Sequence, residues 1–341
     1  MKKKKKTGGS PLTVLAILLA AVLVFRDHAG EILENLKAVP LWGTAALLAL
    51  AAAYQLLESG ICAVLVRSRL PGFSFRTAME VTFLGVFGNV ATFAVGSIPM
   101  QSLYLRRNGL SVGSGVGLMT VEYIFHKSSI LLYAAVMLLF QGAWLREAVP
   151  EVSGYLLAGF GVCAAVTAVL VLLCAWERLE KLALRLLALL PDTGKWAGRR
   201  DAWQNNLEAL YTESQAILKN RSCRVRVFLL NGAKLFCLYS AAWLAVYLLG
   251  ADLPFQRAQL LSSLMLLIAS ALPNVAGVGP AEFAFLLLFG RYLSAAGASA
   301  ALVLYRAATY FFPFAASIPF ALRVQHRSRT SPDEGDDSPR G

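Results

Sequence analysis

Long apolar runs separated by short basic clusters limit most strongly what this sequence can fold into. A transmembrane helix needs about 20 apolar residues. Only 15% of the residues are charged, whereas soluble proteins carry about a quarter. We therefore predict an all-α, polytopic integral membrane protein with about six full spans, the first of them short, at residues 11–26, 41–66, 113–140, 152–176, 227–249 and 297–322.

The net charge of +12 comes from basic residues placed between the apolar runs. A nucleic-acid-binding domain would gather them on one soluble unit, so we exclude nucleic acid as a partner. Lysine and arginine beside membrane spans orient a protein and attract anionic lipid. Residues 2–6 are all lysine, and Arg26-Asp27-His28 stands where a signal peptidase needs small residues, so we expect a retained first span.

Two further apolar segments, residues 77–105 and 258–290, are interrupted near their middle. The first has 29 residues, whereas two complete spans need about 40. We predict that each segment is a re-entrant hairpin, which enters the membrane and returns to the same side. The interruptions are Gly85, Gly88, Asn89, Gly96 and Pro99 in the first segment and residues 273–280 in the second.

The distribution of basic residues agrees with this topology. With the lysine-rich end in the cytoplasm, every strongly basic loop and both termini fall on the cytoplasmic side. The hairpins then enter from opposite faces, each between two spans, which outlines an inverted repeat of the kind found in transporters. Asn89-Val90-Ala91 and Asn274-Val275-Ala276 give this repeat weak local support.

We predict one transmembrane domain over residues 1–325 and a disordered cytoplasmic tail over residues 326–341. Residues 177–226 contain ten basic and six acidic residues, with leucines at helical spacing. We interpret them as a cytoplasmic amphipathic insert on the membrane surface, divided by a turn at residues 191–194.

Ionisable residues within spans are costly and usually functional. Broken hairpins at membrane depth must be buried or line a wet cavity, although their glycines could instead serve close helix packing. We expect a lipid phosphate to meet Arg306 and Lys234 near the start of a short helix at Pro280, with Glu122 or Glu282 balancing the charge. The candidate lipid-binding residues are Arg306, Glu282, Lys234, Glu122, His126, Asn89, Asn274, Gly277 and Gly279.

Two alternatives stay open at this point. The charged residues could form structural ion pairs that only hold helices together. Glu58 and Lys127, near the polar edges of their spans, could equally extend to the membrane interface. Nucleotide loops, catalytic triads, paired carboxylates and metal motifs are missing from the sequence, so we expect no enzyme and no cofactor. Gly85-x-x-Gly88 and the glycines at 113, 115 and 117 are best explained by helix packing.

The second hairpin resembles a known family. Pro273-x-x-Ala276-Gly277-x-Gly279-x-x-Glu282, followed by Arg306, is similar to the Pro-x-x-Gly-Gly-x-Gly-x-x-Glu…Arg signature of the lysylphosphatidylglycerol synthase transmembrane-region family. The first hairpin, with Asn89, Pro99 and Arg106, resembles the other motif of that family. Ala276 replaces one glycine of the signature, and the Gly-Gly expected near Pro99 is missing.

The resemblance implies a flippase-like protein of the bacterial cytoplasmic membrane, linked to resistance against antimicrobial peptides. Its expected partner is an anionic or aminoacylated phospholipid such as aminoacylated phosphatidylglycerol, and a homo-oligomer is compatible with the family. Because no soluble aminoacyltransferase domain follows, the resemblance implies translocation or binding of lipid, and not its synthesis. The alternative is a non-transporting accessory subunit that presents lipid to a membrane enzyme or glycosyltransferase.

Overall fold

The computed structural model describes residues 29–92, 96–148, 150–188, 197–271 and 279–330. Every regular element in these ranges is helical, which confirms the all-α prediction. The helices are α2 (Ala29–Ala38), α3 (Leu41–Arg67), α4 (Phe75–Ala91), α5 (Ser97–Arg107), α6 (Val112–Ala148), α7 (Pro150–Ala175), α8 (Glu177–Ala188), α9 (Ala197–Lys219), α10 (Arg221–Leu248), α11 (Phe255–Ala271), α12 (Pro280–Phe289), α13 (Ala295–Arg306) and α14 (Phe312–Thr330), with short helices η1 (Gly290–Tyr292) and η2 (Ala307–Phe311) before and after α13.

Five of the predicted spans are helices long and apolar enough to cross a membrane. They comprise Leu41–Arg67, Val112–Ala148, Leu156–Ala175, Arg221–Leu248 and Ala295–His326. The predicted first span at residues 11–26 and most of the predicted tail lie outside the described residues. The fold is therefore that of a polytopic α-helical membrane protein.

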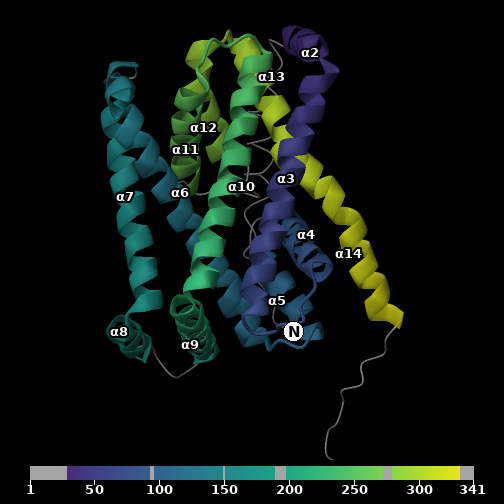
Figure 1. Ribbon diagram of the computed structural model, residues 1–341, viewed down its shortest axis with the longest axis vertical. Helices are drawn as coiled ribbons and strands as arrows, with labels where there is room; N and C mark the ends of the chain where they lie inside the picture. Colours follow the sequence, from purple (N-terminus) through teal and green to yellow (C-terminus); the bar gives the residue numbers. More distant parts are fainter. Residues whose placement is uncertain (1–28, 93–95, 149, 189–196, 272–278, 331–341) are drawn as a thin grey trace, which may run out of the picture.

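Helix α6 is longer than the sequence predicts. It has 37 residues, and at 1.5 Å per residue it extends about 55 Å, well beyond a hydrocarbon core of about 30 Å. The predicted end at residue 140 was wrong because the helix continues through the polar residues Gln141 and Arg146. In Figure 1 it crosses the bundle obliquely, which is how long helices fit a thinner bilayer.

Both interrupted segments form pairs of short helices. Helices α4 and α5 lie at one end of the bundle, together with α8 and α9, while α11 and α12 lie at the other end (Figure 1). The two helix pairs thus lie at opposite ends of the bundle, as expected for oppositely oriented hairpins, while their re-entrant course in a membrane stays a prediction. The connection at residues 272–278 lies outside the described residues.

Two of the glycines predicted to interrupt the first hairpin, Gly85 and Gly88, do not interrupt its helix, whereas Gly96 does lie at the break, directly before α5. Gly85 and Gly88 both lie within α4, which continues to Ala91. A Cβ added to Gly88 would lie 2.7 Å from the carbonyl oxygen of Gly96, and one on Gly85 would lie 2.5 Å from the amide of Gln101. These glycines therefore allow α5 to pack closely against α4, as helix-packing motifs do.

Helices α3 and α10 run antiparallel through the centre of the bundle (Figure 1). Gly43, near the start of α3, faces Leu248 at the end of α10, and Gly60 faces Leu230. Each of these helices precedes one hairpin, and the hairpins lie at opposite ends. This arrangement agrees with the inverted repeat outlined by the sequence.

The last span contains an interruption that the sequence analysis did not predict. Helix α13 ends at Arg306, a π-helical turn follows over Ala307–Phe311, and α14 continues with Pro313 in its first turn. Proline cannot donate the backbone hydrogen bond that a regular helix needs here, and π turns occur often at functional sites. In Figure 1 the last span changes direction between α13 and α14, where this turn lies.

The basic insert forms two helices, α8 and α9, as predicted, but it ends earlier. Residues 221–226 belong to α10, whose first turn is capped by the Asn220 side chain accepting from the Cys223 N–H at 3.1 Å. Helix α9 packs on α6 and is held by an ion pair between Glu213 and Arg69, 2.7 Å apart. The insert is therefore fixed to the transmembrane bundle.

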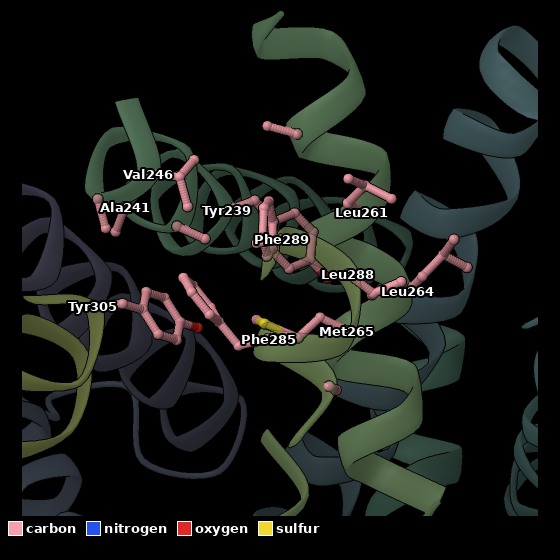
Figure 2. Close-up of a cluster of buried hydrophobic side chains, with 14 of the residues drawn as sticks. Tyr239, Ala241, Val246, Leu261, Leu264, Met265, Phe285, Leu288, Phe289 and Tyr305 are labelled. Carbon is pink, nitrogen blue, oxygen red and sulfur yellow. The ribbon is translucent and has the colours of Figure 1, made fainter. Parts of the chain in front are cut away.

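An apolar core behind the second hairpin holds α10, α11, α12 and α13 together. Figure 2 shows Phe285 between Tyr305 and Met265. The rings of Phe285 and Tyr305 stack with centroids 5.5 Å apart, and Phe289 packs beside Phe285 at 4.9 Å. This core supports the inner end of α13, which carries Arg306.

Candidate functional site

Three adjoining cavities, which share lining residues and which we together call the branched cavity, lie between the inner ends of the two hairpins. Its main chamber has a volume of about 580 Å³, a lower chamber about 310 Å³ and a side chamber about 270 Å³. All three share Asn89, which lies near the inner end of α4. The main chamber also touches the inner ends of α11 and α12 at Ser270 and Ala281. The hairpins thus border cavities whose walls are partly polar, in agreement with the cavity that the sequence predicted.

Arg306 faces the main chamber and pairs with Glu282. Its Nε donates to Glu282 Oε1 at 2.5 Å, and its guanidinium lies 5.3 Å from the ring centre of Tyr310. The other carboxylate oxygen of Glu282 accepts from the backbone N–H of Gly279 at 2.6 Å. One carboxylate therefore connects the start of α12 with the end of α13.

Gly279 precedes α12 in a conformation that favours glycine. Its φ of +107° would strain any residue with a side chain. This backbone turn places Pro280 at the first helical position and Glu282 within the first turn, where an acidic side chain stabilises a helix. The predicted start of the short helix is confirmed, while Asn274 and Gly277 lie outside the described residues.

Lys234 does not reach the cavity but pairs with Glu58. The Lys234 side chain is 0% exposed, and its ammonium donates to the Glu58 carboxylate and lies 5.5 Å from the Tyr54 ring centre. The Glu58 side chain is 27% exposed and lines the lower and side chambers. The alternative in which Glu58 extends to the membrane interface is therefore wrong.

Glu122, His126 and Lys127 lie one after another on the cavity side of α6. Glu122 lines the lower chamber, His126 lines both the lower and main chambers, and Lys127 lines the main one. The Lys127 ammonium donates to Ser270 Oγ at 2.8 Å, which connects α6 with the inner end of α11. Within the described chain, His126 Nδ1 is buried without a hydrogen-bond partner.

The charges in the cavity are separated by sign. The main chamber carries the two cationic side chains Lys127 and Arg306, and its remaining wall is neutral or aromatic apart from His126. The lower chamber carries the two carboxylates Glu58 and Glu122. Arg306 is already paired with Glu282 and Glu58 with Lys234, so within the described residues Lys127 and Glu122 are the lining charges that a molecule with an anionic and a cationic group could balance.

Sequence reasoning left Glu58, Lys127 and Tyr54 out of the predicted site. The partner of Lys234 depends on how α3 and α10 are aligned, which a single sequence does not reveal. Glu58 and Lys127 did carry a signal, because both are ionisable residues within apolar runs. Because both residues lie near the ends of those runs, access to the membrane interface explained their charges equally well.

The family comparison agrees with this architecture. A family model described as the lysylphosphatidylglycerol synthase TM region matches residues 13–317. The chain belongs to this family. It is thus a membrane domain of a kind linked to the synthesis or flipping of lysylphosphatidylglycerol. A comparison with curated proteins gave no match.

Proposed function

We propose that the protein moves a phospholipid between the leaflets of the bacterial cytoplasmic membrane, with the head group passing through the branched cavity. The separation of charge supports a head group with both signs, such as that of an aminoacylated phosphatidylglycerol. Its phosphate would face Arg306 and Lys127, and its ammonium would face Glu58 and Glu122. This charge pattern is the observation that carries the proposal.

The size of the cavity fits a head group and excludes a whole lipid. The main chamber of about 580 Å³ lies within the roughly 300–1,000 Å³ of pockets for small ligands. Two acyl chains need far more space, so they would stay in the bilayer while the head group crosses. Polar walls lower the cost of bringing a charged group to membrane depth.

We further propose that the end of the bundle with α4, α5, α8 and α9 faces the cytoplasm. Most basic residues outside the apolar runs gather there, including Arg106 and Arg107 in the last turn of α5. The basic helices α8 and α9 would then lie against the anionic inner leaflet.

Native mass spectrometry of co-purified lipids tests the binding step. We expect lysylphosphatidylglycerol to be retained in preference to phosphatidylglycerol, and Arg306→Ala to lose this retention. Arg323→Ala, an exposed arginine of α14, is the matched control and should retain lipid like the wild type. Equal retention in both variants would contradict the assignment. Retention without transport in liposomes would favour the accessory-subunit function.

A further inference from the structure

Glu122 is a buried carboxyl group that forms no direct ion pair with any residue in the part of the chain that the structure describes. Its residue is 8% exposed, and within the described chain it makes no hydrogen bond or ion pair. It interacts electrostatically with Glu58 and Lys234, which already pair with each other. Two carboxylates therefore share a single ammonium.

Among the described residues, the groups around Glu122 offer no second cation in contact with it. Those near it are Tyr54, Glu58 and Cys62 from α3, Lys234 from α10, and Tyr123 and His126 from α6 itself. Helix α5 contributes the neutral Ser97 and Gln101 to the chamber wall, and α11 contributes Ser270, which binds Lys127. On α9, Glu213 pairs with Arg69, and on α7, Cys163 lies beside Lys127.

An ionised carboxylate in such a place is costly. Burial disfavours the charged form, and so does the neighbouring carboxylate of Glu58. A proton on Glu122 removes the excess negative charge, because Glu58 and Lys234 then balance each other. A cation in the lower chamber would remove it equally well.

We propose that Glu122 is a proton-exchange site, which holds a proton while the cavity is empty and releases it when a cationic lipid head group enters the lower chamber. The inference rests on the proposed function and adds an energy source to it. The O–H bond of the Glu122 carboxyl breaks, its electron pair stays on the carboxylate, and the proton passes to water in the cavity. One positive charge enters and one leaves, so the charge of the cavity does not change.

This exchange couples lipid movement to the proton gradient. After the lipid leaves, Glu122 takes up a proton from one side of the membrane, which restores the protonated empty site. The proton is released to the other side when the next lipid enters, so proton and lipid move in opposite directions. Binding of a cationic lipid should then strengthen about tenfold per pH unit over the range in which the empty site is protonated, the slope for one exchanged proton.

Infrared spectroscopy of the protein in phosphatidylcholine nanodiscs tests the protonated state directly. We expect a carbonyl band from a protonated carboxyl group that Glu122→Gln removes and Glu122→Asp shifts. Glu147→Gln, an exposed glutamate of the same helix, should leave the band unchanged. A wild-type spectrum without such a band, or a band unaffected by both Glu122 variants, would overturn the proposal even if the protein transports lipid.

Addition of lysylphosphatidylglycerol in weak buffer tests the exchange. We expect one proton released per lipid bound, loss of the infrared band, and neither effect with phosphatidylglycerol. The affinity of the Glu122→Gln variant for the same lipid should lack this tenfold change per pH unit. Because both proteins bind the same lipid, the difference between their pH dependences excludes the contribution of the lipid's own amine. Binding with the band intact would overturn the exchange and leave the proposed function standing, whereas failure to bind any phospholipid would reject both.

Discussion

Replacing Glu58 by methionine should destabilise the protein more than replacing Lys234 by methionine. The two partners of this ion pair differ in exposure, since the Lys234 side chain is 0% exposed and that of Glu58 is 27% exposed. Removal of Glu58 leaves an ammonium group with no access to water. Removal of Lys234 leaves a carboxylate that can take up water from the lower chamber.

The expected magnitudes follow from this difference. Breaking a buried ion pair by removing one partner costs about 3–5 kcal/mol, which we assign to Glu58→Met. Lys234→Met should cost roughly 1.5–3 kcal/mol, the worth of a hydrogen bond between charged groups. Glu122 also interacts with Lys234 and can supply part of the missing negative charge, so adding Glu122→Gln to Glu58→Met should increase the loss.

Thermal unfolding in detergent, monitored as the loss of monodisperse protein, measures the stability of each variant. The double variant Glu58→Met/Lys234→Met should recover much of the stability, because no charge remains unpaired. Glu147→Met serves as the exposed control and should change little. A smaller loss for Glu58→Met than for Lys234→Met, or no recovery in the double variant, would refute the reasoning.

Four further predictions concern the second hairpin and the topology. Arg306→Lys should keep the fold but weaken lipid binding about tenfold or more, because an ammonium cannot offer two parallel donors to a phosphate. Native mass spectrometry measures this binding, and an affinity equal to that of the wild type would contradict the prediction. A swap of charges between Arg306 and Glu282 should not restore stability in thermal unfolding, since an arginine cannot accept the Gly279 N–H; full restoration would show that the pair only holds helices together. Gly279→Ala should cost about 1–3 kcal/mol in the same assay because of its positive φ. A cysteine at position 107 should be labelled only from the cytoplasm, and labelling from outside would reject the orientation.

The sequence predicted the spans well because their length and charge obey simple rules. Apolar runs between basic clusters correspond to α3, α6, α7, α10 and the last span. Their ends were predicted less well. Helix α6 continues past residue 140 and α10 begins at Arg221, because polar residues can extend a helix beyond the membrane without penalty.

The candidate site could be predicted only in part. Arg306 and Glu282 stood out as charges in apolar sequence, and the structure places them in contact. The pairing of Lys234 with Glu58 joins residues from two halves of the chain, and it depends on the alignment of α3 and α10. The π turn after Arg306 depends likewise on tertiary packing, which local propensity does not reveal.

Movement of lysylphosphatidylglycerol across sealed liposomes tests the central claim most directly. Purified protein is reconstituted into phosphatidylcholine vesicles that carry a fluorescent form of this lipid, and a membrane-impermeant quencher reports the share in the outer leaflet. We expect the wild type and the control Arg323→Lys to exchange the lipid much faster than protein-free vesicles, and Arg306→Lys to be about tenfold slower than the wild type. A wild-type rate equal to that of protein-free vesicles would contradict the claim that this cavity translocates lipid.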